Sequence, residues 1–291
     1  MKDPREVNRQ RAAALGQEAV VISRTGNYPL PSGRTVDVRA DVEAAIAGTV
    51  AYPPNTRVPA PAAGRFKTTF DVTHETTLSA GRRLADAGRR VCALNFASAK
   101  NPGGGFLGGS RAQEESLARS SALYVCIEGS PMYDYHRRSG DPMYSGYALY
   151  SPDVPVFRDD AGDLLERPWS CSFITCPAVN AKVTLGRDPH AGPAIRDAMR
   201  ERVARVLAIA AAKGQSHLVL GACGCGVFGN DPTEIASLFR ESFDGMFRGV
   251  FEHVTFAILD SSTDRRMVGA FARAFDGTRP APVPSWSVDE P

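Results

Sequence analysis

The chain has almost no excess of charge of either sign. Its 291 residues include 34 Lys and Arg against 32 Asp and Glu. This balance excludes a general basic field that would hold a polyanion by charge alone. Any recognition of phosphate therefore has to come from local contacts.

Long apolar runs are also missing. No stretch approaches the roughly 20 apolar residues that cross a bilayer. The opening segment MKDPREVNRQRAAAL mixes charges of both signs and lacks the apolar core of a signal peptide. We therefore expect no membrane association and a cytoplasmic location.

Patterns for metal binding and for disulfides are sparse as well. The six cysteines lie mostly in apolar runs such as VCALNF and LYVCI, which is typical of buried free thiols. Cys223 and Cys225 form a C-x-C pair without the second Cys or His cluster that a four-ligand site needs. The five His residues show no H-E-x-x-H spacing. The sequence thus predicts neither a metal site nor a cofactor.

From residue 65 to residue 275, short apolar runs alternate with helical patterns, which is typical of an α/β sheet covered by helices. The expected strands are 68–73, 91–96, 147–150, 171–177, 217–220 and 254–259. The expected helices are 75–87, 112–124, 193–213, 232–243 and 263–275. Residues 1–64, with a helix at 4–23 and the Pro-rich stretch YPPNTRVPAPAAG, are interpreted as an accessory region, and 276–291 as a disordered tail.

The segment 94–124 predicts a strand, a glycine-rich loop and a helix. Gly103, Gly104 and Gly105 remove every Cβ from one part of that loop. A ligand can then lie directly against backbone N–H groups, with a helix N-terminus just behind them. Such a loop suits a phosphate-rich or sugar ligand.

Glu114 and Glu115 follow in the first turn of this expected helix. Carboxylates are common at that place because the helix dipole favours them, so an isolated pair would indicate only solvated surface residues. The preceding glycine loop changes that interpretation. Adjacent helical side chains point about 100° apart, so both carboxyls can reach a ligand over the loop while serving two different roles.

A second strand, glycine loop and helix is predicted at 217–239. The loop consists of Gly221, Ala222, Cys223, Gly224, Cys225, Gly226, Val227, Phe228 and Gly229. Its backbone amides, with a helix that begins after the cap residue Asp231, can hold a diphosphate without any lysine. A tight strand–helix connection with Phe228 in the core would explain one such loop, but two loops of this kind favour a ligand site.

The spacing of GGG, seven residues and QEE, which ends at Glu115, resembles the signature of the poly(ADP-ribose) glycohydrolases. Their catalytic domain is a macrodomain, and NFASAKNPGGGF together with the long N-terminal part is most similar to the bacterial-type members. The resemblance implies a macrodomain-like three-layer αβα fold over residues 65–275, with a mixed sheet of roughly six strands. It implies hydrolysis of ribose–ribose bonds in poly(ADP-ribose), mainly from chain ends, with release of ADP-ribose.

The same resemblance implies the partners of the protein. They are poly(ADP-ribose), ADP-ribose and ADP-ribosylated proteins, in the context of the DNA damage response. We expect a monomer without direct DNA binding.

Residue roles also follow from the resemblance. Glu115 would be the acid/base, and Glu114 would bind and orient the ribose that is cleaved, with Gln113 and Asn101 in support. The second loop would hold the diphosphate, and Phe228 would pack on the distal ribose. One carboxyl can protonate the leaving oxygen and then activate water, so the neutral form of Glu115 has to be accessible near neutral pH.

Three other interpretations compete with this one. Gly103, Gly105 and Gly108 match G-x-G-x-x-G, with Glu128 about twenty residues further on. Residues 98–102 intervene between the strand and the first glycine, however, unlike in a dinucleotide-binding unit. A macrodomain that only reads ADP-ribose would not need two acids beside an anionic ligand. A serine hydrolase based on Ser110 lacks a positioned His and Asp.

Overall fold

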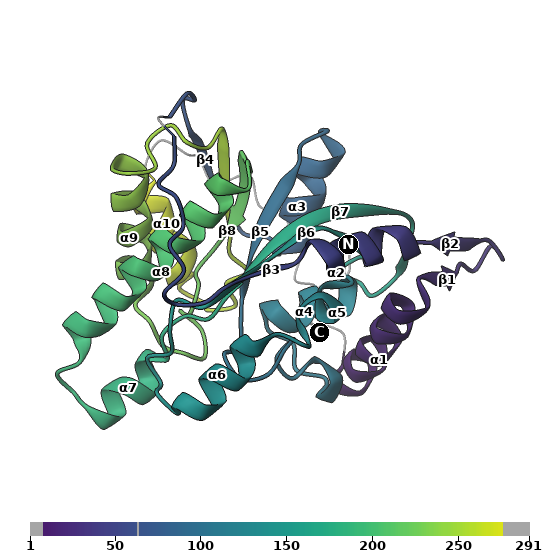
Figure 1. Ribbon diagram of the computed structural model, residues 1–291, viewed down its shortest axis with the longest axis horizontal. Coiled ribbons are helices and arrows are strands. Elements are labelled where there is room, and N and C mark those ends of the chain that lie inside the picture. The colour runs from purple at the N-terminus through teal and green to yellow at the C-terminus, as the bar shows by residue number, and fades with distance from the viewer. Residues whose placement is uncertain (1–7, 63, 276–291) are drawn as a thin grey trace.

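The computed structural model describes residues 8–62 and 64–275. A central sheet lies between two layers of helices (Figure 1). One layer consists of α8 (Gly192–Ala212), α9 (Pro232–Asp244) and α10 (Arg266–Ala274). The other contains α1 (Arg9–Thr25), α2 (Arg39–Gly48), α3 (Thr77–Asp86), α4 (Gln113–Ser120) and α5 (Leu123–Ile127). The expected three-layer αβα arrangement is confirmed.

The sheet has seven strands in the order β3-β6-β7-β5-β8-β9-β4. The six expected strands are β4 (Thr69–Thr73), β5 (Val91–Phe96), β6 (Ala148–Arg158), β7 (Leu164–Cys176), β8 (His217–Leu220) and β9 (His253–Ala257). β7, β5, β8, β9 and β4 run parallel, and β6 is antiparallel to β7. Parallel strands are covered on both faces, which explains the continuous apolar runs of β5 and β8.

The seventh strand, β3 (Val50–Tyr52), comes from the region expected to be accessory. It adds antiparallel to β6, with Ala51 opposite Leu149. β3 has only three residues, of which Val50 and Ala51 are exposed and Tyr52 is partly buried. A strand this short shows no alternation of apolar and polar residues by which the sequence could reveal it. The same region also contains a small hairpin of β1 (Asn27–Pro29) and β2 (Thr35–Asp37). The N-terminal region is therefore joined to the central sheet through a strand of its own.

The helix expected at 112–124 is wrong as a single element. It breaks at Ser121, which takes an extended conformation with φ −144° and ψ 172°. Ser121 pairs with Val156, and the Ala122 N–H donates to the Pro155 carbonyl at 3.1 Å. Backbone pairing with β6 thus replaces one turn of helix, and α4 and α5 lie on either side. The short helices α6 (Pro131–Ser139) and α7 (Ala181–Arg187) also lack an expected counterpart.

Several other expectations can be compared with the described residues. The helix expected at 4–23 corresponds to α1, which starts at Arg9 and ends at a left-handed Gly26. All six cysteines are free, as expected. None of the helices within residues 8–62 and 64–275 has the length and apolar composition needed to cross a bilayer. The tail at 276–291 lies outside the described residues.

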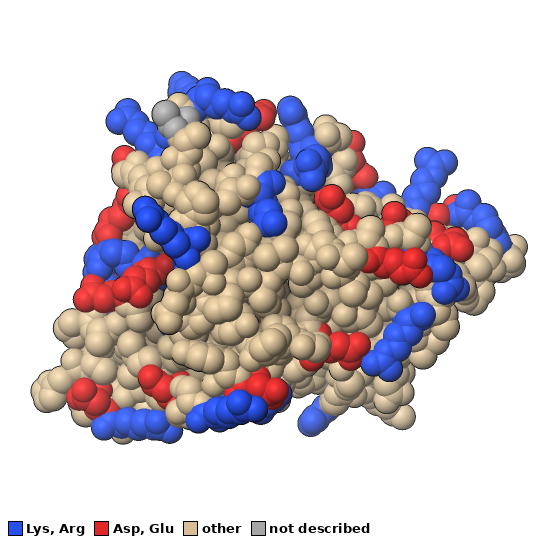
Figure 2. All heavy atoms as spheres, viewed as in Figure 1, with Lys and Arg blue, Asp and Glu red and all other residues tan. Residues whose placement is uncertain are grey.

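Charged side chains of both signs are interspersed on the surface. On the face shown in Figure 2, Lys and Arg lie mostly at the margins, with Asp and Glu among them. Most of that face carries uncharged residues (Figure 2). It offers no extended basic field, in keeping with the balanced composition.

Helix α1 packs directly against the segment that contains the first glycine loop. A Cβ on Gly16 would lie 3.0 Å from the ring of Phe106, in the 3₁₀ turn η2 (Phe106–Gly108). The Arg9 Nε donates to the Gly108 carbonyl at 3.0 Å. The N-terminal region therefore forms one wall behind this loop.

Arg158, which is 1% exposed, holds α1 and α4 together. Its guanidinium donates to the carbonyls of Arg119 at 2.5 Å, Leu15 at 3.3 Å and Gly162 at 3.2 Å. It also pairs with Glu18 on α1. One buried cation thus joins the N-terminal helix, the end of α4 and the β6–β7 hairpin.

We predict that Arg158→Met lowers the free energy of unfolding by about 2 kcal/mol or more, because each buried acceptor left without a donor costs about 1 to 3 kcal/mol. Arg90→Met is the control, since Arg90 pairs with Asp153 at 3.5 Å with its side chain 73% exposed, and it should change stability by less than about 0.5 kcal/mol. Guanidinium unfolding measures both. Equal effects of the two variants would contradict the role given to Arg158.

Candidate active site

The two glycine loops lie at the same end of the sheet. They follow β5 and β8, which are neighbouring parallel strands, so both loops leave from the carboxyl ends of their strands. A Cβ on Gly221 would lie 2.9 Å from the ring of Phe96, the last residue of β5. Ligand sites of open parallel sheets lie at this end, so the two predicted loops form one candidate site.

Glu114 and Glu115 are both buried at the start of α4, with 4% and 9% exposure. The Ser98 N–H donates to Glu114 Oε2 at 2.7 Å. The Gly105 N–H donates to Glu115 Oε1 at 2.9 Å. The alternative that both glutamates are solvated surface residues is therefore wrong, because backbone amides of the preceding segment bind both carboxyls.

The glycine triplet makes this arrangement possible. Gly103 and Gly104 have φ of +69° and +60°, which is a backbone conformation that residues other than glycine rarely adopt. A Cβ on Gly104 would lie 2.3 Å from Glu115 Oε1 and 3.2 Å from Glu114 Oε2. The bare backbone of the loop thus lies directly against the two acids.

The pKa of Glu114 is raised to about 8, mainly because burial removes water from its carboxyl. The neighbouring Glu115 carboxyl raises this pKa as well. Hydrogen bonds from Ser98 and Asn95 to Glu114 lower it, but less than burial raises it. Glu114 is accordingly mostly neutral at pH 7.

Asn95 is a site residue that the sequence analysis missed. It is fully buried on β5, and its Nδ2 donates to Glu114 Oε1 at 3.4 Å and to Thr175 Oγ1 at 3.2 Å. Its Oδ1 has no hydrogen-bond partner among the described residues. The one available signal was an amide in the otherwise apolar run VCALNF.

Gln113 and Asn101 make different contacts around the first glycine loop. The Gln113 side chain accepts from the Phe96 N–H at 2.9 Å and donates to the Leu94 carbonyl at 2.8 Å, so it ties α4 to β5. Asn101 is exposed, its N–H donates to Ser98 Oγ at 3.1 Å, and its carbonyl accepts from Gly104. Both residues shape the loop through these contacts.

The second loop leaves several backbone donors open. Within the described residues, the N–H groups of Gly224, Gly226, Val227 and Phe228 donate no hydrogen bond. Behind them, Asp231 caps α9 by accepting from the Thr233 N–H at 2.7 Å, as expected. Open amides in front of a helix N-terminus can bind an anion.

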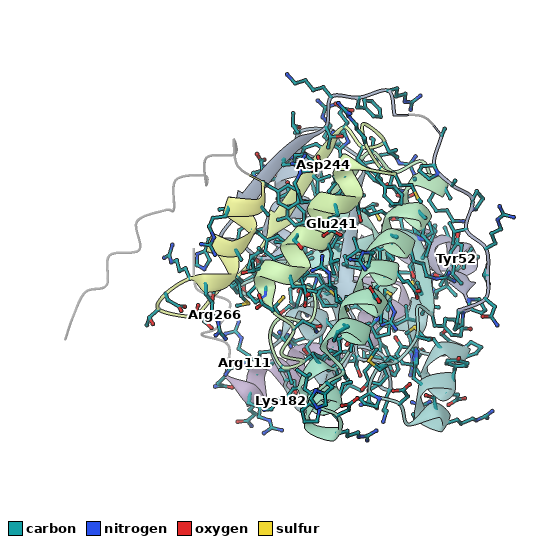
Figure 3. All side chains as sticks on the ribbon, turned by 90° about the vertical axis from the view of Figure 1, so that its left-hand side faces the viewer. Tyr52, Arg111, Lys182, Glu241, Asp244 and Arg266 are labelled. Carbon is teal, nitrogen blue, oxygen red and sulfur yellow. The ribbon has the colours of Figure 1, made fainter. Side chains whose placement is uncertain are left out.

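Phe228 is partly buried on this loop and packs beside Tyr144, with ring centroids 6.1 Å apart. Tyr144 takes a φ of +52°, which is uncommon for a residue other than glycine and often marks a functional position. The Phe228 carbonyl accepts from the N–H of Lys182, which Figure 3 labels at the lower end of the molecule. Tyr144 and Lys182 were not expected, because their segments carry no motif.

A metal site at the second loop finds no support in the described part of the chain. No group of three or more His, Cys, Asp or Glu side chains gathers there in a way that could hold an ion. Burial raises the pKa of Cys225 to about 12 and that of Cys223 well above its ordinary value. Both are therefore neutral thiols at pH 7.

Comparison with known proteins agrees with this geometry. The family model of the microbial-type PARG catalytic domain matches residues 16–159. A crystal structure of poly(ADP-ribose) glycohydrolase from Thermomonospora curvata is 46% identical, with a TM-score of 0.86, and the match covers 92% of this chain and 100% of that one. The same enzyme bound to the inhibitor ADP-HPD is 45% identical, with a TM-score of 0.84 and the same coverage.

A glycohydrolase structure from Deinococcus radiodurans in complex with ADP-ribose is also similar. It is 46% identical with a TM-score of 0.75, and the match covers 80% of this chain and 96% of that one. Comparison with the curated proteins gave no match.

The raised pKa of Glu114 predicts how stability depends on pH. Unfolded, this carboxyl has its ordinary pKa of 4.5, whereas folded it keeps its proton up to about pH 8. The protonated Glu114 carboxyl therefore makes its full contribution to stability below pH 4.5. As pH rises from there to about 8, this contribution is lost, and the free energy of unfolding falls by about 1.4 kcal/mol per pH unit.

Glu114→Gln cannot ionise and should lack this dependence. Guanidinium unfolding at pH 5.5 and pH 7.5 should show wild type losing roughly 3 kcal/mol more than the variant over this range. Glu128→Gln, at a partly exposed carboxyl on the surface, is the control and should behave as wild type. An identical pH dependence of wild type and Glu114→Gln would show that Glu114 ionises normally.

Proposed function

Because the chain belongs to the microbial-type poly(ADP-ribose) glycohydrolases, we propose that Glu115 and Glu114 form its catalytic centre and the two glycine loops its ligand site. The protein is a glycosyl hydrolase that cleaves ribose–ribose O-glycosidic bonds in poly(ADP-ribose) and releases ADP-ribose. The observation that supports this centre most strongly is the buried pair of carboxyls under the Gly103–Gly105 triplet.

Glu115 is the acid/base in this proposal. A carboxyl at the leaving oxygen donates a proton as the glycosidic bond breaks and afterwards takes one from the attacking water. Glu114 binds and orients the ribose. Since Glu114 is mostly neutral at pH 7, it adds little repulsion against an anionic ligand and can share its proton with a ribose hydroxyl.

The ligand lies across both loops. Its diphosphate meets the open N–H groups of residues 221–229, and the distal ribose packs on Phe228. The ribose to be cleaved lies over the acids, with Asn101 and Gln113 shaping the loop beside it. No metal or cofactor takes part.

A pure reader of ADP-ribose is the less favoured alternative. A protein that only binds ADP-ribose has no use for a carboxyl that exchanges protons at the glycosidic bond, whereas cleavage requires one. ADP-ribosylated proteins as partners, a monomeric state, the absence of direct DNA binding and a cytoplasmic location remain predictions.

Glu115→Gln tests the acid/base. Gln retains the acceptor for the Gly105 N–H, so the loop should stay in place, but it cannot exchange a proton as an acid. We predict that turnover of poly(ADP-ribose) falls at least about 100-fold. Calorimetric binding of ADP-ribose should stay close to that of wild type. The control Glu128→Gln should keep full activity, and near-normal turnover by Glu115→Gln would refute this mechanism.

We propose that cleavage proceeds from chain ends, with α1, which packs behind the first loop, closing the far side of the ribose pocket so that only a terminal unit fits. Early in the digestion of long polymer, free ADP-ribose should therefore accumulate while the remaining chains shorten slowly. Gel and chromatographic analysis of the products over time measures this. The appearance of mid-length fragments before the monomer would mean that the pocket is open at both ends.

A further inference from the structure

Helix α8 carries a buried arginine without an acidic partner. Arg202 is 6% exposed, and its guanidinium donates to the Pro177 carbonyl at 3.0 Å and to the Met143 carbonyl at 3.1 Å. No ion pair joins it to a carboxylate within the described residues. Glu201 and Asp141 act on it only from a distance, and both are exposed. A buried cation without a counter-ion destabilises a fold, so its presence calls for an explanation.

Arg202 lies beneath the second loop. It lines a small cavity of about 10 Å³ together with Ala178 and Cys223, the latter a residue of the loop itself. The Cys223 thiol supplies no counter-charge, since burial raises its pKa and keeps it neutral. Burial also lowers the pKa of Arg202, as expected for a cation without an anion, although a guanidinium stays charged in proteins.

The two carbonyls that Arg202 binds belong to segments that support this loop. After Pro177, a Cβ on Gly224 would lie 2.6 Å from the Cβ of Ala178, and the Asn230 side chain donates to the Val179 carbonyl at 2.8 Å. After Met143 comes Tyr144, whose ring packs beside Phe228. Arg202 therefore contacts both supports of the loop without belonging to it.

We propose that Arg202 is the buried counter-charge for the diphosphate of the ligand, acting through the second loop without touching the ligand. The proposal rests on the function proposed above, in which residues 221–229 hold that diphosphate. In the free protein the charge is uncompensated. When an anion binds over the loop, the two opposite charges attract across a poorly hydrated interior, where the attraction is much less screened than in water. Arg202 is thus a positioning residue. Its burial destabilises the free protein, and the attraction to the bound diphosphate offsets this cost only in the complex.

The chain offers a matched control in Arg205, one turn further along α8. Arg205 also has no acidic partner within the described residues, and it donates to the carbonyls of Thr56 at 3.1 Å and Tyr52 at 3.1 Å. In Figure 3, Tyr52 lies at the right-hand edge, well away from Lys182 beside the second loop. Arg205 therefore shares the helix, the surroundings and the type of contact with Arg202, but its guanidinium binds carbonyls of residues 52–56 and neither of the segments that support the second loop.

The test compares two ligands and two variants. Dissociation constants for ADP-ribose, which carries the diphosphate, and for adenosine, which does not, are measured for wild type, Arg202→Met and Arg205→Met. Arg202→Met should weaken ADP-ribose about tenfold or more and leave adenosine within about twofold, as expected if one charge interaction with the diphosphate is lost. The rise in melting temperature on adding ADP-ribose should shrink accordingly. Arg205→Met should bind both ligands as wild type does.

Unchanged ADP-ribose affinity of Arg202→Met would overturn the proposal, as would an equal loss for both ligands, which would indicate a purely structural role. If Arg202→Met does not fold, Arg202→Lys and Arg202→Gln carry the test, since both keep a donor and only Lys keeps the charge. Lys should then retain ADP-ribose affinity and Gln should lose it, and equal affinities would contradict us. Failure of wild type to bind ADP-ribose would instead count against the proposed function.

Discussion

The burial of two adjacent carboxyls is the constraint on which the rest of the site depends. Water is largely excluded from Glu114 and Glu115, so backbone donors have to replace it, and the Ser98 and Gly105 N–H groups do so. Those donors come close enough only because Gly104 has no side chain. Even so the replacement is incomplete, and the pKa of Glu114 rises to about 8. One member of the pair is thereby kept neutral at pH 7, which reduces the repulsion of an anionic ligand at the site proposed here.

Charges buried at a distance from the acids hold this arrangement in place. Arg119 lies one turn beyond Glu115 on α4 and donates to the Ser110 carbonyl at 2.5 Å. Arg158 in turn binds the Arg119 carbonyl and joins α4 to the N-terminal helix. On the other side of the sheet, Arg202 supports the second loop in the same way, through carbonyls. Buried arginines thus contact the supports of both loops. Arg119 has the Glu115 carboxyl near it, Arg158 pairs with Glu18, and for Arg202 we propose the ligand as the counter-charge.

Local patterns in the sequence were sufficient to predict both glycine loops, the acid pair and six of the seven strands. They could not predict β3, whose three residues gain their place only by pairing with β6. They also missed the break at Ser121, where pairing with Val156 overrides a helical pattern. The roles of Asn95, Tyr144 and Arg202 could not be predicted for a related reason. Their importance comes from what the fold packs against them, and a lone amide, tyrosine or arginine in a sequence carries no sign of that.

The central claim is that the acid pair is held buried with Glu114 neutral at pH 7. The most direct measurement is a ¹³C NMR titration of protein labelled at its glutamate carboxyl carbons, with the Glu114 signal assigned by its absence in Glu114→Gln. We expect this signal to shift with a midpoint near pH 8 in the free enzyme. A midpoint near the ordinary value of 4.5 would contradict it, because Glu114 would then be a charged carboxylate throughout the neutral range.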